Sequence, residues 1–334
     1  MKELRIVSDH AACRELWEQL WPQQCVFDLW AVRDCFARHF KRPSFFLTGE
    51  ADNNRPPFLL ALSWIEEDGY FGHFPGETWQ GKTWVEQNKI PGGQALSPEA
   101  VLKAVDGRLH IRYLDADFIP AWGNAVSVDE TGYLLIPPAH GFSFDAYRQC
   151  FPGKSRKKLD QELARLEAQG VRFRHDDMAD IDPMMQMNLA AFGPMSYFYD
   201  PRFFAAFIDL IDFFKKNGML RVTSVEIGGK LAAVDVGAVW RNVYTVMAGG
   251  TNPEFPGVAK LINFHHIRWA CEQRLASVDF LCGDFSWKSR FRLTERPLYK
   301  ICLPETSTAC QTEEATAEPQ GNTADPQRSE NRAG

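Results

Sequence analysis

The stretch that decides the fold lies in the last third of the chain, where residues 243–260 read VYTVMAGGTNPEFPGVAK. Its first part is rich in β-branched and aromatic residues and predicts a strand over 242–248. Gly249-Gly250 and the proline-containing loop after them end this strand. From Gly257 onward the apolar residues recur at helical spacing, which predicts a helix over 257–274. A strand, a glycine-containing loop and a helix N-terminus therefore follow one another here.

The segments around this stretch predict a fixed order of elements. The Gly228-Gly229 pair predicts a two-residue hairpin turn, and Gly218 marks the end of a helix. The predicted elements, in chain order, are strand 171–177, helices 183–192 and 201–217, strands 220–227, 230–240 and 242–248, helix 257–274, and strands 277–281 and 298–303. This order, β-α-α-β-β-β-α-β with a final strand, predicts a mixed α/β (α+β) domain.

The N-terminal part shows a weaker version of the same order. Its predicted elements are strand 3–7, helices 11–21 and 27–40, strands 45–48, 58–65 and 70–74, a short helix after Ser97-Pro98, and strands 109–114 and 132–136. We therefore expect two tandem domains, 1–145 and 146–304, each a mixed sheet flanked by helices. Residues 305–334 lack aromatic residues and Leu, Ile and Val. Such a segment cannot bury enough apolar surface to offset its ordering entropy, so we expect a disordered tail.

Composition excludes several classes of protein. At 334 residues with 45% hydrophobic and 24% charged residues, the chain has the length of two globular domains. Most of the net charge of -6 lies in the tail, which leaves the body nearly neutral. The body therefore lacks the long positively charged face that proteins binding duplex nucleic acid usually have. The eight cysteines show no zinc-site spacing, which predicts that no metal is bound. No apolar stretch has the length of a membrane span or signal peptide, and we expect a cytoplasmic protein.

Three stretches carry a resemblance to a known family. The first is KSRKKL at 154–159, the second is the stretch at 243–260, and the third is VDFLCGD at 278–284, followed by Trp287-Lys288 and by RPLYK at 296–300. With these stretches in this order, the chain resembles the FemAB-like and CelD/BcsL-like (BioF2-like) acetyltransferases of the GNAT superfamily. In that family two GNAT-type halves stand in tandem.

The resemblance implies an acyl-CoA co-substrate. Its diphosphate would be held by backbone amides at a helix N-terminus, at Gly257, Val258 and Ala259, with Lys260 beside them. A backbone N–H of Met247 or Ala248 would bind the thioester carbonyl oxygen. The family pattern has Gln or Arg where this chain has Glu254, and an acid opposes a diphosphate. An acyl-carrier protein or an aminoacyl-tRNA therefore remains open as the donor.

Direct transfer needs a base near the thioester, because the attacking amine or hydroxyl must lose a proton. Asp284 follows a buried strand at Gly283 and is the first candidate, although a turn cap explains it equally well. Asp235 interrupts an apolar strand, and a buried unpaired acid is costly, so it either faces a wet cleft or has a partner. His265 lies in the middle of a helix, where packing is the alternative. Two further candidates are Glu226 and His266.

Other residues are candidates for substrate binding. In the resemblance Lys288 steadies a substrate phosphate or the developing oxyanion, whereas a solvated lysine is the alternative. Arg156 and Lys157 belong to a basic first turn that suits an anionic substrate or forms a solvated helix face. Tyr244 and Trp287 are the remaining candidates for substrate binding. The Gly-Lys-Ser run at 153–155 is not a P-loop, because Arg148 stands where that motif requires glycine.

The loop 71–84 combines aromatic residues, glycines and polar groups. Such a loop suits a flat acceptor in a cleft between the halves. Packing of Trp79 and Trp84 into a core is the alternative.

The sequence therefore predicts an N- or O-acyltransferase that transfers an acyl group from acyl-CoA to an envelope- or polysaccharide-related acceptor, or another small acceptor. Two alternatives stay open. One is a Fem-like transferase that takes its aminoacyl group from tRNA, and the other is a non-catalytic ligand-binding protein of the same fold.

Overall fold

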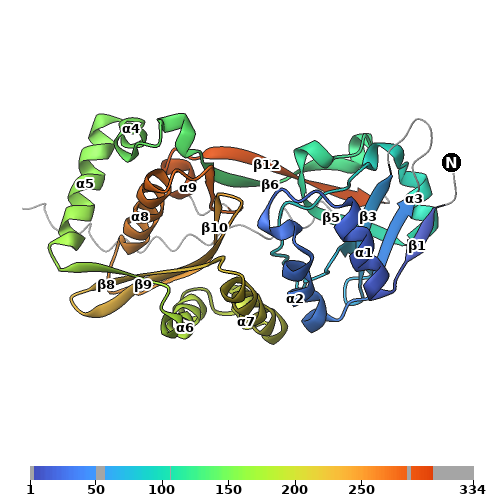
Figure 1. Cartoon of the computed structure of the whole chain (residues 1–334), viewed down its shortest axis with the longest axis horizontal. Coiled ribbons are helices and arrows are strands. Elements are labelled where there is room, and N and C mark those ends of the chain that lie inside the picture. Colours follow the sequence, from blue (N-terminus) through green and yellow to red (C-terminus); the bar gives the residue numbers. More distant parts are fainter. Residues whose placement is uncertain (1–3, 50–56, 106, 284–286, 304–334) are drawn as a thin grey trace, which may run out of the picture.

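The computed structural model describes residues 4–49, 57–105, 107–283 and 287–303. One mixed sheet runs through the whole molecule and is flanked by helices (Figure 1). The expected mixed α/β class is thus confirmed. The predicted tail, 305–334, lies outside the described residues, as does Asp284.

The first half of the chain contains six strands and three α-helices among its described residues. They are β1 (Arg5–Val7), α1 (His10–Leu20), α2 (Trp30–Phe40), β2 (Ser44–Gly49), β3 (Phe58–Ile65), β4 (Tyr70–His73), α3 (Pro98–Val105), β5 (Arg108–Asp115) and β6 (Val126–Leu135).

The second half repeats this order after two additional helices, and it adds one short helix between its last two strands. Its elements are α4 (Phe144–Gln149), α5 (Gly153–Glu167), β7 (Val171–His175), α6 (Ile181–Phe192), α7 (Pro201–Lys216), β8 (Leu220–Ile227), β9 (Lys230–Trp240), β10 (Val243–Thr251), α8 (Val258–Glu272), β11 (Ser277–Asp279), α9 (Trp287–Arg290) and β12 (Thr294–Leu303). The predicted order of elements is confirmed in both halves.

Local chemistry explains why these elements form. The Asp200 carboxylate accepts hydrogen bonds from the amides of Arg202 and Phe203, and Pro201 occupies the first helical position, so α7 begins there. The hairpin between β8 and β9 turns at Gly228 and Gly229, which both have positive φ angles, of 57° and 79°. This is the backbone geometry of a type I′ turn, which glycine adopts without strain.

The two halves exchange their last strands. The strand order is β1-β2-β3-β4-β5-β12-β6-β11-β10-β9-β8-β7. β6, the last strand of the first half, pairs with β11 of the second half, whereas β12, the last strand of the chain, pairs with β5 of the first. β6 and β12 also pair with each other and form the ribbon that joins the halves (Figure 1).

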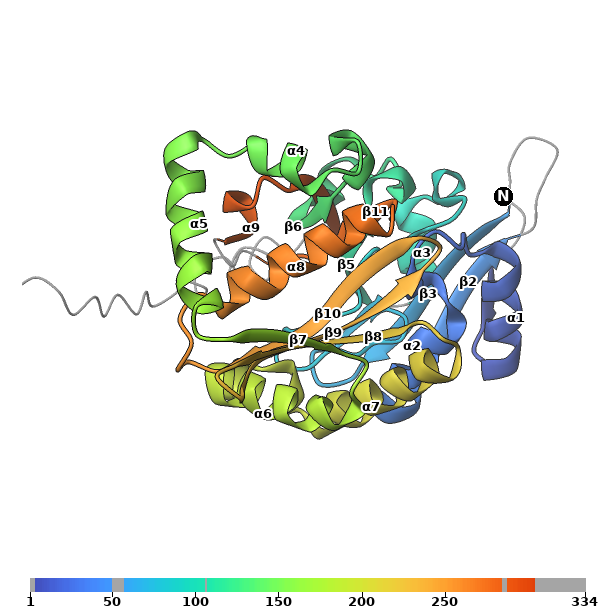
Figure 2. The ribbon, with the colours of Figure 1, turned by 60° about the vertical axis from the view of Figure 1, so that its left-hand side comes forward.

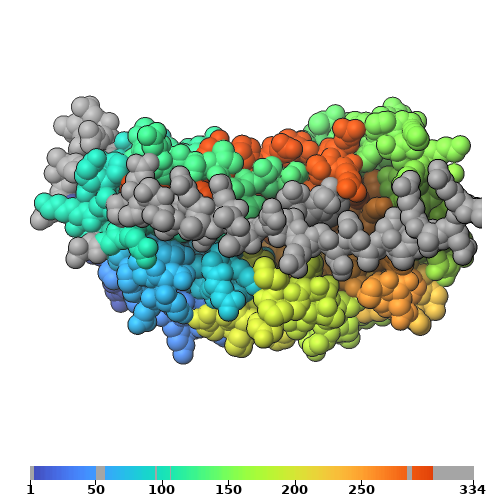
Figure 3. All heavy atoms as spheres, turned by 180° about the vertical axis from the view of Figure 1, so that it is seen from behind, coloured from blue at the N-terminus to red at the C-terminus, as the bar shows by residue number. Residues whose placement is uncertain are grey.

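The halves also share a hydrophobic core. α2 packs against α7, and one cluster of buried side chains combines Phe36 and Trp84 from the first half with Phe203 and Phe207 from the second. Seen from behind, the yellow surface of the second half directly adjoins the blue surface of the first (Figure 3). The sheet continues through both halves. In the second half, α8 covers one face of the sheet, and α6 and α7 cover the other (Figure 2). The junction between the halves is therefore part of the folded core.

Candidate active site at the junction of the halves

The strands β10 and β11 run parallel and then part. Val243, Tyr244 and Thr245 pair with Ser277, Val278 and Asp279, and β11 ends there while β10 continues to Thr251. On its other edge β10 has an irregularity in its pairing with β9 between Val246 and Ala248. A bulge leaves a residue outside the ladder and redirects the strand. Met247 therefore lies at the bulge, next to the gap between the two strands.

The segment after β10 leads into the N-terminus of α8. Gly257 precedes this helix with a φ of 92°, a conformation that favours glycine. The N-terminal turn of a helix presents unpaired amides and positive dipole charge, and so suits an anion. Glu254 pairs with Lys230 at 2.9 Å, and Lys260 pairs with Glu162 of α5 at 2.5 Å. The carboxylate of Glu254 is therefore balanced by a lysine.

Gly249 and Gly250 allow close packing on both faces of β10. A Cβ atom at Gly249 would lie 2.1 Å from Oδ1 of Asp235, and one at Gly250 would lie 2.4 Å from the carbonyl oxygen of Met184. The Asn188 side chain also donates to the carbonyl of Gly249 at 2.7 Å. These contacts fix the position of the strand that borders the gap.

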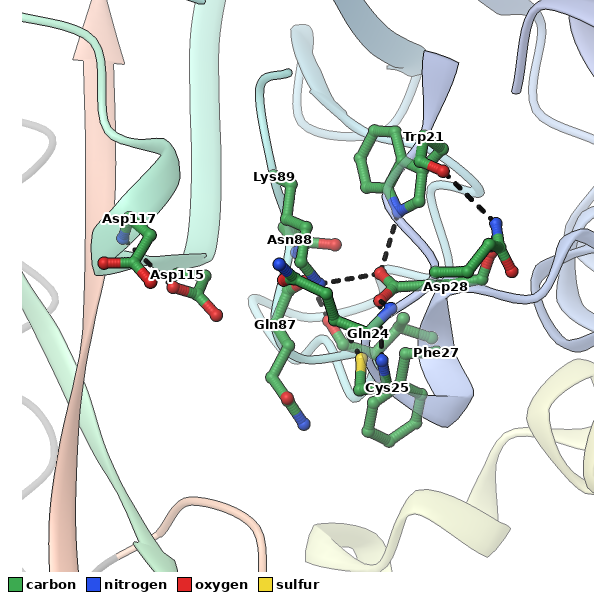
Figure 4. A network of polar contacts seen from close by, with 12 residues as sticks. Trp21, Gln24, Cys25, Phe27, Asp28, Gln87, Asn88, Lys89, Asp115 and Asp117 are labelled. Carbon is green, nitrogen blue, oxygen red and sulfur yellow. Dashed lines mark hydrogen bonds and ion pairs between the residues drawn. The ribbon is translucent and has the colours of Figure 1, made fainter. Parts of the chain in front are cut away.

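A segment of the first half, residues 84–90, reaches across to the second half. Its Asn88 amide donates to the carbonyl of Tyr113, so this end lies beside β5. Buried Lys89 anchors it, because Nζ donates to Asp28 Oδ1 at 2.7 Å. The Asp28 carboxylate also accepts from the indole of Trp21 at 2.8 Å, whereas Gln87 points away from it (Figure 4). These contacts anchor the segment in the first half, directly after the residues that meet β11.

Glu86 of this segment is a buried acid at the end of β11. Its Oε1 accepts a hydrogen bond from the amide of Cys282 at 2.8 Å. Its Oε2 is buried without a hydrogen-bond partner among the described residues and lies 4.0 Å from Nη2 of Arg296. Burial, and next the charge of Asp279, raises the pKa of Glu86 to about 7. At neutral pH this carboxyl group can therefore both accept and release a proton.

Asp279, the last residue of β11, is in contrast fully bonded. Its carboxylate accepts from the guanidinium of Arg296 at 2.9 Å, from the amide of Leu281 at 2.9 Å and from the side chain of Gln87 at 3.0 Å. These bonds join β11, β12 and the segment 84–90. Asp279 thus holds in place the residues that surround Glu86.

Lys288 lies in the same neighbourhood. The side chain is buried, and Nζ donates to the carbonyls of Leu281 at 3.0 Å and Cys282 at 2.5 Å. Burial lowers its pKa. Lys288 therefore holds the chain that leaves β11, close to the amide that bonds Glu86. Trp287 begins α9, directly before it.

Asp235 has a partner, as one of the two sequence interpretations required. Its Oδ2 lies 2.9 Å from Nε2 of His266, which is fully buried on α8. Tyr244 is also fully buried, with its ring over Gly237 and 5.2 Å from that of His266. These three residues lie inside the layer between the sheet and α8.

The other predicted residues lie apart from Glu86. The ring of His265 stacks on Phe173 at 3.9 Å, and burial lowers its pKa to about 3, so it is neutral at physiological pH. Arg156 and Lys157 belong to the first turns of α5, where Lys157 is exposed. Glu226 pairs with Arg172 at 2.9 Å on the outer strands.

The loop 71–84 agrees in part with each of its two interpretations, core packing and the lining of a hollow. Trp79 and Trp84 are buried in the shared core. The loop residues Glu77, Thr78 and Thr83 line a small hollow in the first half.

Comparison with known protein families identifies the type of domain in the second half. Residues 153–289 match the family described as an acetyltransferase (GNAT) domain. These residues form a GNAT-type acetyltransferase domain. The GNAT domain includes the gap between β10 and β11 and the start of α8, and it assigns the chain to the acyltransferases. A comparison with curated protein sequences finds no significant match.

Solved structures share the fold over nearly the whole chain. L-PGS from Bacillus licheniformis has a TM-score of 0.54 at 11% identity, covering 94% of this chain and 98% of that one. FemX has 0.52 at 9%, covering 89% and 96%. A conserved protein of unknown function from Bacteroides thetaiotaomicron has 0.53 at 12%, covering 90% and 99%. At this identity they show the fold alone. Among the described residues no helix is both long and apolar enough to cross a membrane.

Proposed function

We propose that this chain transfers an acyl group from acyl-CoA directly to an amino or hydroxyl group of a small acceptor, of the envelope- or polysaccharide-precursor type. The observation that carries the proposal is the gap where β10 and β11 part after three paired positions. Within a GNAT domain this gap leads to a helix N-terminus at Gly257.

The donor would lie along β10, with its diphosphate at the amides of Gly257, Val258 and Ala259. The helix dipole and unpaired amides favour a group of that charge. The pairing of Glu254 with Lys230 supports this placement, because it offsets the acid that stands in the family's Gln or Arg position. The amide of Met247 or Ala248, at the bulge, would donate to the thioester carbonyl oxygen.

Glu86 is the base that the geometry supports best. The acceptor's nitrogen or oxygen attacks the thioester carbonyl carbon and loses its proton to the Glu86 carboxylate. The carbon–sulfur bond then breaks, and the thiolate of the donor takes up a proton as it leaves. A pKa of about 7 suits a group that must accept and then release a proton at neutral pH. Lys288 would position the end of β11, which Asp284 follows in the sequence.

The rival donor is an aminoacyl-tRNA. The exposed residues Lys154, Lys157 and Lys158 on α5 favour it, because they suit a polyanion. The two donors differ in salt dependence. Binding of tRNA should weaken steeply with salt, whereas binding of acyl-CoA should change far less.

A thermal-shift titration with CoA, acetyl-CoA and longer acyl-CoA tests the proposal. A ligand at 100 times its Kd adds about 2.7 kcal/mol to the stability of the folded chain. We expect a saturable rise in melting temperature with at least one acyl-CoA. No rise with any of them, together with salt-sensitive binding of aminoacyl-tRNA, would replace the acyl-CoA donor by the rival.

A further inference from the structure

Three residues around Glu86 have a strained backbone. Of the residues that the structure describes, eleven other than glycine have positive φ angles, and only three of the eleven are buried. They are Gln87, Tyr113 and Leu281, with φ angles of 57°, 55° and 59° and exposed fractions of 6%, 4% and 6%. For a bulky residue this left-handed conformation is an outlier. Residues held in it cluster at functional sites, where the surrounding contacts fix them.

Two of these residues flank the hydrogen bond that joins Glu86 to the second half. Gln87 directly follows Glu86, and Leu281 directly precedes Cys282. The amide of Cys282 donates to Oε1 of Glu86 at 2.8 Å. A left-handed residue bends the chain sharply. Each bend therefore lies next to one partner of this bond.

One carboxylate holds both bends. Oδ2 of Asp279 accepts from the side chain of Gln87 at 3.0 Å, and Oδ1 accepts from the amide of Leu281 at 2.9 Å. The guanidinium of Arg296 donates to both oxygens, at 2.9 and 3.3 Å. On the other side, Nζ of Lys89 donates to the carbonyl of Gln87 at 3.1 Å. The strained conformation of Gln87 is thus fixed both at its side chain and at its carbonyl.

Tyr113 supports the same segment from the first half. Arg112 and Tyr113 together oppose a single residue of β12, so β5 has a bulge there. The amide of Tyr113 donates to Oδ2 of Asp129 at 3.1 Å, and its carbonyl accepts from the amide of Asn88 at 2.8 Å. Asn88 lies two residues after Glu86. The third strained residue therefore also holds the segment that carries Glu86.

We propose that Gln87 is a positioning residue for the acyl transfer: its left-handed backbone, fixed by Asp279, holds the Glu86 carboxyl group at the end of β11. The inference rests on the proposed role of Glu86 as the base. A base removes a proton only within hydrogen-bond reach of it, so a displaced Glu86 is a poor base. Gln87 acts on the reaction only through Glu86.

The amide of Cys282 reports the position of Glu86. An amide proton bonded to a carboxyl group changes its chemical shift when that group ionises. In the full ¹⁵N-labelled chain we expect the Cys282 amide signal to titrate with a midpoint at about 7, the pKa of Glu86. The same signal should stay constant in Glu86→Gln. This measurement needs neither an acyl donor nor an acceptor.

Substitutions at Gln87 separate its backbone from its side chain. Gln87→Val and Gln87→Gly both lose the bond to Asp279, but only glycine adopts the left-handed conformation without strain. We expect the titration of the Cys282 amide to vanish in Gln87→Val and to persist in Gln87→Gly. Gln80→Val is the matched control, because Gln80 has a φ of 50° but is exposed. It should keep the native titration.

Turnover of acetyl-CoA connects this position to the reaction. The kcat of Gln87→Val should fall by roughly 10²-fold, the cost of a misplaced catalytic group, with the KM for acetyl-CoA unchanged. A native kcat in a chain that has lost the Cys282 titration would remove Gln87 and Glu86 from the reaction.

The titration itself decides whether Gln87 positions Glu86. A Cys282 titration that survives in Gln87→Val, or that is lost equally in Gln80→Val, refutes the proposal, whatever the acyl-CoA experiments show. If Gln87→Val fails to fold, Gln87→Ala takes its place, because alanine has the same conflict with the left-handed conformation in a milder form. Equal titrations in Gln87→Ala and Gln87→Gly would then refute the proposal.

Discussion

Glu86, on a loop of the first half, accepts a hydrogen bond from the amide of Cys282 in the second half, at 2.8 Å. This bond places a buried carboxyl group at the end of β11, where β10 and β11 have parted. The gap and the donor loop belong to one half, and the base belongs to the other. The second half alone therefore lacks the acid that the proposed reaction uses.

The first prediction concerns the proton transfer at Glu86. Glu86→Gln keeps the shape and the hydrogen-bond acceptor but cannot take up a proton. We expect kcat to fall by roughly 10²–10⁴-fold, the usual contribution of a general base. In the native protein kcat/KM should rise with pH through about 7, as the carboxyl group ionises, and this limb should vanish in the variant. Initial rates between pH 5.5 and 8.5 measure both effects.

The stability of the same variant provides its control. The pKa of Glu86 is raised in the folded chain, so its protonated form stabilises the fold below the unfolded pKa, and this stability is lost as pH rises through about 7. Glu86→Gln should therefore unfold at a higher urea concentration than the native protein at pH 8.5. Lower activity together with a lower urea midpoint at that pH would indicate a structural role instead.

The second half was predictable because each element has a local signal. Strands β8 and β9 were predicted with their observed bounds, since the Gly228-Gly229 turn and the apolar runs both act over short distances. The ribbon of β6 and β12 was predicted too short. Residues 126–131 read VSVDET, a mostly polar run whose strand conformation depends on pairing with β12. Such pairing joins residues far apart in the chain and leaves little periodicity in either segment.

The candidate base was missed for a similar reason. Glu86 stands in a loop with no motif around it, and its raised pKa comes from burial against the other half. The charged residues in the run from Glu86 to Lys89 are unusual in a segment that is buried throughout. The sequence alone does not show that burial. Asp235 was noticed because it interrupts an apolar strand, and that signal correctly indicated a partner, His266.

The second prediction concerns the donor loop. Gly257→Val introduces a β-branched side chain at a φ of 92°, which should displace the first turn of α8 and its amides. Gly218→Val is the matched control, because Gly218 also has a positive φ, has open space around it and lies at the far end of α7. Both variants should lose stability, but only Gly257→Val should raise the KM for acyl-CoA, by about tenfold or more. Similar KM values in the two variants would remove Gly257 from the donor site.

The third prediction separates Asp235 from the chemistry. Asp235→Ala leaves the buried Nε2 of His266 without its partner, and an unpaired buried polar group costs about 1–3 kcal/mol. We expect this loss in urea denaturation, with kcat of the folded fraction unchanged. Asp235→Asn keeps an oxygen at the same place and should recover part of the stability. A kcat that falls in both variants at unchanged stability would instead place Asp235 in the mechanism.

The fourth prediction follows from the exchanged strands. Because β6 and β12 each complete the sheet of the other half, neither half can unfold without losing a strand from its neighbour. We expect a single urea transition, with tryptophan fluorescence and far-ultraviolet circular dichroism giving the same midpoint.

Arg296→Met removes the guanidinium that bonds the buried Asp279 carboxylate at 2.9 Å, which should cost about 3–5 kcal/mol. It should lower the midpoint seen by both probes equally, since β11 and β12 lie on either side of β6. Two separate transitions, only one of which moves in the variant, would mean that the halves unfold independently in spite of the exchange.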